Sequence, residues 1–253
     1  MMETTTLLFD ADIIAYKFAV AGQTNIKFDE GDPVVILENP EDVCSEVDEY
    51  IKHFMDYLSA TDYIVCLSSS SASNFRKKFF PEYKANRSNI VRPVMLQAVR
   101  EHLELNHPTY IRDTLEADDV MGILSTSTKL CRCKKIIVSE DKDMKTIPGW
   151  LFNPRKDEQP RLISEEEADY WHLYQTLVGD TTDNYKGCPG IGEKKAERAL
   201  ADSCTWQTVV DLFVAKGLTE DDALVQARLA RILRASDYDF KKKEPILWLP
   251  PTK

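Results

Sequence analysis

Short runs of apolar residues alternate, along the first part of the chain, with longer segments whose apolar residues recur every three or four positions. The apolar runs predict buried strands at 6–9, 63–67, 109–111 and 136–138, and a fifth at 150–152. The helical spacing predicts a helix from about Pro40, another around Leu96, Val99 and Leu103, and a third over 116–130. Strands that alternate with helices are typical of βαβ units, so we predict an α/β fold with a mostly parallel central sheet.

From Ser164 onward the pattern is helical only. Ser164 and Glu167 have the spacing of a capping box, which marks the start of a helix. Further helical patterns cover 193–201, 206–215 and 220–235. We therefore predict an α/β domain over 1–163 and a helical region over 164–253.

Acidic residues stand where several predicted elements begin or end. They form five groups, which are Asp10/Asp12, Glu116/Asp118/Asp119, Glu140/Asp141/Asp143, Asp180 and Asp183. The strands of a parallel sheet end at one common edge, where function is usually located, and Asp10 and Asp141 follow such strands. Glu116 and Asp119 share a helix face at i, i+3, while Asp141 and Asp143 point the same way in an extended segment. Taken alone, each group is more typical of a helix cap or a solvated loop.

If these acids converge, their mutual repulsion must be cancelled, and hard divalent cations do this with oxygen ligands. Two Mg²⁺ ions about 4 Å apart can clamp a phosphodiester for in-line hydrolysis. The sequence has no His-x-x-x-His or Cys-x-x-Cys pair that would favour zinc. It also has no phosphate-binding loop of the Gly-x-x-x-x-Gly-Lys-Ser/Thr type.

A basic segment between Arg76 and Arg92 complements the acids. It includes Tyr83, Lys84 and Arg87, a combination that suits single-stranded or frayed nucleic acid, although a solvated surface loop has the same composition. The whole chain carries 42 acids against 32 bases, for a net charge of -10. This balance argues against nonspecific binding of nucleic acid, but binding depends more on the local distribution of charge than on the net charge.

A Gly- and Pro-rich turn at 187–192 separates two of the predicted helices. Gly190 and Gly192 would let the backbone approach a phosphate at the start of the next helix, where Lys194 and Lys195 follow. A plain helix–helix turn is the alternative interpretation of this segment.

Several ordered segments together resemble one known family. They are Pro-Glu-Tyr-Lys-Ala-Asn-Arg at 81–87, Leu-Glu-Ala-Asp-Asp-Val-Met-Gly at 115–122, Asp-Lys-Asp-Met-Lys-Thr-Ile-Pro at 141–148, the segment 171–183 that ends in Gly-Asp-Thr-Thr-Asp, and Ala-Arg-Ile-Leu-Arg at 230–234. The chain is similar to the phage 5′-3′ exonuclease and flap endonuclease family, and most of all to exonucleases of the short-tailed phages. The resemblance implies a PIN-like nuclease domain over 1–163, followed by a helix-hairpin-helix-type region over 164–253 that completes the metal site.

The resemblance also implies the activity and its residues. It implies Mg²⁺-dependent hydrolysis of DNA from 5′ ends, with Mn²⁺ as a substitute, together with cleavage of 5′ flaps and of RNA in RNA–DNA hybrids. The implied metal ligands are Asp10, Glu116, Asp118, Asp119, Asp141, Asp143, Asp180 and Asp183, of which Asp10 and Asp141 are catalytic along with Lys84 and Arg87. The implied DNA contacts are Arg76, Lys77, Tyr83, Lys84, Arg87, Gly190, Gly192, Lys194 and Lys195, and relatives can bind K⁺ at a turn like 187–192. Asp12 is either a supporting residue or a helix cap.

One departure from the family pattern concerns a metal-site acid. An aspartate is expected before Asn74-Phe75-Arg76, but the chain has only serines at 68–71, and we place the replacement at Ser71. This change motivates an alternative, a DNA-binding relative with impaired catalysis. A PIN-type ribonuclease shares the metal chemistry and is a further alternative.

The resemblance and the termini also bear on location and partners. We expect a monomer that acts in phage DNA replication or recombination in the host cytoplasm. No apolar run approaches the roughly 20 residues needed to span a bilayer, and the first residues lack the basic segment of a secretory signal. We therefore expect no association with membranes.

Overall fold

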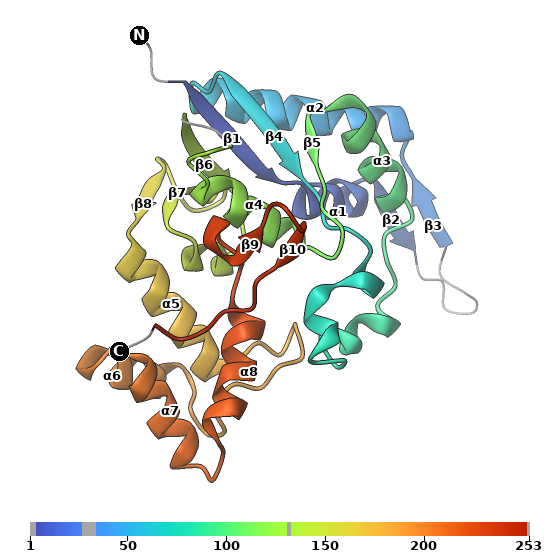
Figure 1. The fold of residues 1–253 in the computed structure, drawn as a ribbon. Helices are drawn as coiled ribbons and strands as arrows, with labels where there is room; N and C mark the ends of the chain where they lie inside the picture. Colours follow the sequence, from blue (N-terminus) through green and yellow to red (C-terminus); the bar gives the residue numbers. More distant parts are fainter. Residues whose placement is uncertain (1–3, 27–33, 131–132, 252–253) are drawn as a thin grey trace.

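A six-stranded sheet forms the centre of the molecule. The computed structural model describes residues 4–26, 34–130 and 133–251. The strand order is β5 (Thr109–Tyr110), β4 (Asp62–Cys66), β1 (Thr5–Asp10), β6 (Lys134–Val138), β7 (Gly149–Phe152) and β8 (Arg161–Ile163). All neighbouring pairs are parallel except β7 and β8, which are antiparallel (Figure 1). The predicted α/β fold with a mostly parallel sheet is confirmed.

Alternation along β1 gives the sheet two buried faces. Leu7 and Phe9 pack against α1 (Ala11–Ala21), α2 (Pro40–Tyr57) and α3 (Leu96–Asn106), whereas Leu8 faces α4 (Ala117–Thr126). Helices therefore cover both faces, as a parallel sheet requires. Because β1, β4 and β6 are parallel and adjacent, residues that follow these strands meet at one edge.

The helices after the sheet have a core of their own. They are α5 (Glu165–Val178), α6 (Glu193–Asp202), α7 (Trp206–Val214) and α8 (Glu220–Ala230). Leu177, Leu200, Phe213 and Ala223 are buried together between them. The hydroxyl of Ser164 accepts a hydrogen bond from the Glu167 backbone N–H at 3.1 Å and so caps α5.

After α8 the chain returns to the sheet. The helix predicted over 220–235 ends at Ala230, because Ile232 and Leu233 extend into the core on the α4 side. A side chain at Gly122 of α4 would lie 2.3 Å from the Leu233 carbonyl oxygen, so glycine permits this close approach. A short hairpin follows on α4, formed by β9 (Tyr238–Asp239) and β10 (Glu244–Pro245) (Figure 1). The helical region therefore stops short of the predicted 253.

Short elements complete the fold. A second hairpin pairs β2 (Gln23–Ile26) with β3 (Val34–Leu37). The 3₁₀ helices are η1 (Ser71–Ser73), η2 (Phe75–Lys78), η3 (Ala85–Asn89), η4 (Lys142–Thr146) and η5 (Ala235–Asp237). Among the described residues, no helix has both the length and the apolar character needed to cross a membrane.

Candidate active site

Two acids come directly from the ends of sheet strands. Asp10 ends β1 and caps α1 by accepting from the Ile13 N–H at 3.2 Å, and the Ser139 hydroxyl donates to its other oxygen at 2.7 Å. Asp141 follows β6 and caps η4 by accepting from the Asp143 N–H at 2.8 Å. These local hydrogen bonds hold both carboxylates at the same edge of the sheet.

Further acids arrive from α4 and from the segment after α5. Together they line a cavity of about 340 Å³ that brings Asp10, Asp12, Glu116, Asp118, Asp141, Asp143, Asp180 and Asp183 together. The structure thus gathers seven of the eight predicted metal ligands. Asp180 is held in place by accepting from the Thr182 N–H at 2.6 Å.

Asp119, the eighth predicted ligand, does not line this cavity. It is fully buried, and its two oxygens accept from the Arg76 guanidinium at 2.7 and 2.8 Å. It also accepts from the Leu233 backbone N–H at 3.1 Å. Both carboxylate oxygens are therefore used, and Asp119 is removed from the proposed ligands.

Arg76 and Tyr83, two predicted DNA contacts, are also buried. Each is 2% exposed, so neither presents a surface on which a base could stack. The Tyr83 hydroxyl lies 2.7 Å from a Glu116 oxygen and 3.0 Å from an Asp183 oxygen. Both residues line the acidic cavity and hydrogen-bond to Glu116, so we propose them as supports of the acids in place of the predicted DNA contacts.

Lys84 and Arg87 reach into the acidic cavity. Lys84 forms a short hydrogen bond with Glu116 and lies 3.4 Å from Asp183, while Arg87 lies 2.5 Å from Asp183. Lys84 also has φ of 57°, a left-handed conformation that is uncommon for a residue with a side chain. The two basic side chains balance part of the negative charge of the cavity.

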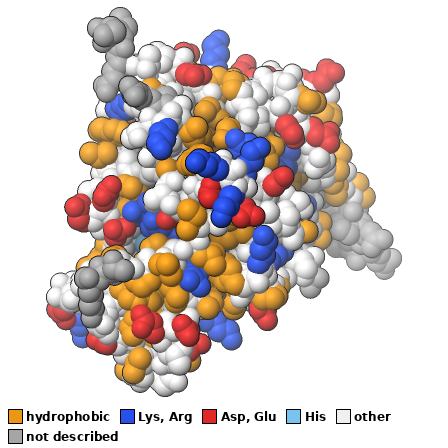
Figure 2. Space-filling view, viewed as in Figure 1, with side chains coloured by type: hydrophobic (Ala, Val, Ile, Leu, Met, Phe, Trp, Pro, Cys, Tyr) orange, Lys and Arg blue, Asp and Glu red, His pale blue; other side chains and the backbone are white. Residues whose placement is uncertain are grey.

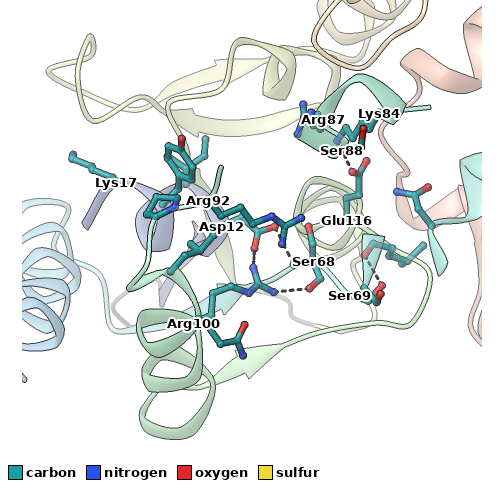
Figure 3. Close-up of a pocket in the computed structure, with 18 of the residues that line it drawn as sticks. Asp12, Lys17, Ser68, Ser69, Lys84, Arg87, Ser88, Arg92, Arg100 and Glu116 are labelled. Atoms are coloured by element: carbon teal, nitrogen blue, oxygen red, sulfur yellow. Dashed lines mark hydrogen bonds and ion pairs between the residues drawn. The ribbon is translucent and has the colours of Figure 1, made fainter. Parts of the chain in front are cut away.

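A second cavity, of about 1140 Å³, adjoins the first, and basic side chains outnumber acidic ones among its lining residues. Its basic lining residues are Lys17, Lys77, Lys84, Arg87, Arg92, Arg100 and Arg155, and it shares Asp12, Ser68, Lys84, Arg87 and Glu116 with the acidic cavity. Figure 3 shows Arg100 reaching from α3 to Asp12 and to the Ser68 carbonyl, which accepts at 2.8 Å. Asp12 is thus a paired supporting residue.

The negative net charge therefore hides a local basic surface. Figure 2 shows Lys and Arg side chains gathered among acids near the middle of one face. Sequence analysis did not single out Lys17, Arg100 or Arg155. Arg100 lies in a predicted helix, and the spacing of apolar residues in that helix does not show that its side chain contacts Asp12 and Ser68.

The serine run meets the acidic cavity at Ser68. Among the serines of this run whose side chains the structure describes, Ser68 borders both cavities, whereas Ser69 and Ser70 border only the larger one. The Ser68 hydroxyl accepts from the Ala117 N–H at 2.9 Å. The side chain of Ser71, where we placed the missing acid, lies outside the described part, so Ser68 becomes the candidate for that position.

The glycine turn lies apart from both cavities. Gly190 has φ of 72°, and Gly192 caps α6. Lys194 and Lys195 are exposed, and the Lys195 ammonium donates to the Gly190 carbonyl at 2.9 Å. The Gly190 carbonyl is thus paired with the Lys195 ammonium, and Lys194 is exposed beside it.

The electrostatics of the cavity fit a site for cations. Burial and the neighbouring acids raise the pKa of Asp10 to about 7 and that of Asp143 to about 7. Burial would also raise the pKa of Glu116, but Lys84 and Arg76 outweigh it and lower that pKa to about 2. An all-oxygen donor set with this much repulsion is suited to hard divalent cations.

We expect the cation-free protein to lose thermal stability as the pH rises from 6.5 to 8. The ordinary pKa of Asp10 and Asp143 is 3.8, so across this range the unfolded chain is already ionised while the folded chain must still lose protons. The buried His172, whose pKa is lowered to about 3, acts in the opposite direction only below about pH 6.5. The measurement is the melting temperature in EDTA and in Mg²⁺. An equally large fall of the melting temperature in Mg²⁺ would contradict the interpretation of these acids as a cation site.

Comparisons with known proteins agree with this geometry. Residues 5–149 match the family model described as the 5′-3′ exonuclease N-terminal resolvase-like domain. The chain is 33% identical to the exonuclease of Escherichia phage T7 in an alignment of 224 positions, with 74% of each chain covered. It is 33% identical to the exodeoxyribonuclease of Enterobacteria phage T3 over 221 residues, 74% of this chain and 73% of that one.

Solved structures show the same fold. The phage T5 protein co-crystallised with metal ions superimposes with a TM-score of 0.66 at 17% identity, over 89% of this chain and 88% of that one. The phage T5 flap endonuclease in complex with DNA and metal ions gives a TM-score of 0.65 at 17% identity, with the same coverage.

Proposed function

The chain belongs to the 5′-3′ exonuclease family, and we propose that it hydrolyses DNA phosphodiester bonds from 5′ ends with divalent cations bound in the acidic cavity. The convergence of carboxylates from four separate parts of the chain on one cavity carries this proposal. The proposed ligands are Asp10, Glu116, Asp118, Asp141, Asp143, Asp180 and Asp183. Among the described residues, only Glu116 and Asp183 of this set form ion pairs with basic side chains, so cations would balance the other acids.

Mg²⁺ is the proposed ion, with Mn²⁺ as a substitute, because the ligands are all oxygens. When bound, two such ions activate water and stabilise both the attacking and the leaving oxygen. Asp10, Glu116, Asp118 and Asp141 would hold one ion, and Asp143, Asp180 and Asp183 the other. We retain K⁺ at the 187–192 turn as part of the proposal.

Lys84 and Arg87 would act on the phosphate. They form ion pairs with Glu116 and Asp183, which are also proposed ligands. Cations at these acids would free the two side chains to turn toward a phosphate at the boundary of the two cavities. There they would stabilise the negative charge that develops on the phosphate oxygens.

The larger basic cavity would hold the strand that carries the 5′ end. Lys77 and Arg92 line it, and it joins the acidic cavity at Lys84. Duplex DNA would extend to the exposed turn with Gly190, Gly192, Lys194 and Lys195. Cleavage of 5′ flaps, tolerance of RNA in hybrids, a monomeric state, and a role in phage DNA replication or recombination in host cytoplasm complete the proposal.

The test follows the fate of a 5′ label. Duplex DNA labelled near one 5′ end is incubated with the protein in Mg²⁺ or EDTA, and the products are resolved on a denaturing gel. Short labelled products that require the metal support the proposal. Intact DNA in both Mg²⁺ and Mn²⁺, with binding retained, would instead support an impaired DNA-binding protein. Preference for RNA over duplex and flapped DNA would support a ribonuclease.

We expect Lys84→Met to lower turnover on the order of 10²-fold, with a smaller effect on DNA affinity. Methionine keeps most of the apolar stem but removes the charge that faces Glu116 and the phosphate. Single-turnover rates measured over a range of DNA concentrations separate the two effects. Lys78→Met, a change at an exposed neighbour, is the matched control. A loss of affinity without a slower maximal rate would exclude a role in the reaction.

A further inference from the structure

A group of imidazole and carboxylate side chains lies far along the sheet from the acidic cavity. Asp48 belongs to α2, His102 to α3, and His107 follows the end of α3, two positions before β5. The group thus lies at the opposite end of the strands from Asp10, beside Tyr63 near the start of β4. None of the three residues lines either cavity described above.

The three side chains converge on one point. The Nε2 atoms of His102 and His107 lie 2.6 and 2.9 Å from the same oxygen, Oδ1 of Asp48. Their three potential ligand atoms all lie within 4.8 Å of one another. Two of the four histidines of the chain are involved. We propose that Asp48, His102 and His107 form a second metal site that takes Zn²⁺ or a chemically similar transition-metal ion.

The type of ligand selects the ion. Imidazole nitrogen suits Zn²⁺, Cu²⁺ and Ni²⁺, whereas Mg²⁺ prefers oxygen ligands, so the two sites of the protein would take different ions. Bond lengths of 2.0–2.2 Å in a tetrahedral Zn²⁺ site imply separations of roughly 3.3 Å between ligand atoms. The observed contacts are hydrogen bonds and must open by about 0.5 Å. The Asp48 side chain is 50% exposed and is free to make this movement.

The second nitrogen of each ring already has a partner that suits a bound metal. Nδ1 of His107 lies 3.1 Å from the Tyr63 hydroxyl, and Nδ1 of His102 lies 3.2 Å from the Asn106 side-chain amide. A hydroxyl can donate or accept, and an amide can do either by turning over. The Tyr63 hydroxyl therefore accommodates either tautomer of His107, as the outer partners of metal-bound histidines do. The Asn106 amide can accept from His102 Nδ1–H only by giving up its 3.0 Å hydrogen bond to the His102 carbonyl.

Sequence analysis missed this group because its spacing is not that of a motif. His102 and His107 are five positions apart and come together only because α3 ends at Asn106. Asp48 comes from another helix. A bound ion would join α2 directly to α3, the helix whose Arg100 holds Asp12 and Ser68 at the active site.

The test measures Zn²⁺ binding in excess Mg²⁺, which occupies the acidic cavity. We expect one Zn²⁺ per chain by equilibrium dialysis, a higher melting temperature with Zn²⁺, and imidazole scattering in the X-ray absorption spectrum. Asp48→Asn and His102→Gln should each weaken binding at least about tenfold, and Tyr63→Phe about tenfold. His53→Gln, a histidine of α2 outside the group, should bind as the parent chain does.

Two results would overturn the proposal. One is no retained Zn²⁺ in excess Mg²⁺. The other is unchanged binding in Asp48→Asn and His102→Gln, with only oxygen scattering around the ion, which would place the Zn²⁺ among the acids of the active site. Asp48 is half exposed, so Asp48→Asn is expected to fold normally even if a histidine variant does not. Nuclease activity is not used as the readout, so the test does not depend on the proposed function.

Discussion

In Asp141→Asn protein we expect cleavage of 5′-labelled DNA to fall at least about 10²–10³-fold, while DNA binding is retained or becomes tighter. Asp141 stands at the end of β6 among the acids of the cavity, so its charge is needed to hold a cation there. The amide oxygen of asparagine can still accept from the Asp143 N–H, so η4 keeps its cap. Removal of one negative charge also weakens the repulsion of a DNA phosphate.

The experiment measures single-turnover cleavage and DNA affinity for the parent, Asp141→Asn and Asp202→Asn. Asp202 is an exposed acid at the end of α6 and receives the same chemical change. It should leave both quantities unchanged. Unchanged cleavage in Asp141→Asn would remove Asp141 from the site. A loss of both cleavage and DNA binding, with a lower melting temperature, would indicate a folding defect instead.

The convergence of Asp10 and Asp141 was predictable from the sequence because it needs only local patterns. Asp10 directly follows a short apolar run, Asp141 comes three positions after the end of another, and parallel strands end at a common edge. The positions of Asp180 and Asp183 could not be predicted in this way. Both acids follow a helix, and the helical pattern does not show that its end lies at that edge of the sheet. Their place at the cavity was expected only from the resemblance to the family.

Asp119 shows why spacing within a helix was not sufficient. Glu116 and Asp119 do share a side of α4, as the i, i+3 spacing predicted, since Arg76 contacts both. The sequence could not show that Arg76, 43 positions earlier, would occupy both oxygens of Asp119. Pairing across such a distance depends on packing, which also ended α8 at Ala230 instead of 235.

The Arg76–Asp119 pair should be essential to stability, and we expect Asp119→Asn to lower the free energy of unfolding by about 3–5 kcal/mol. The pair is buried, and the change leaves the Arg76 charge with only the more distant Glu116 carboxylate, at 3.5 Å, as a counter-charge. Asp119 also accepts from the backbone of Glu116 and of Leu233, so it joins the start of α4 to the returning chain. A loss of this size is a large fraction of the stability of a typical domain.

The neighbouring acid, Asp118, provides a matched control, because the same substitution is expected to change the melting temperature in the opposite direction. Burial and the charges of Asp10 and Asp141 raise the pKa of Asp118 well above its usual value. In EDTA, Asp118→Asn should therefore keep or raise the melting temperature, whereas Asp119→Asn should lower it. In Mg²⁺, only Asp118→Asn should lose the stabilisation that the cation provides. One result would contradict this assignment: Asp119→Asn protein that is as stable as the parent in EDTA but binds Mg²⁺ more weakly. Asp119 would then be a metal ligand, and the buried pair would be part of the cation site.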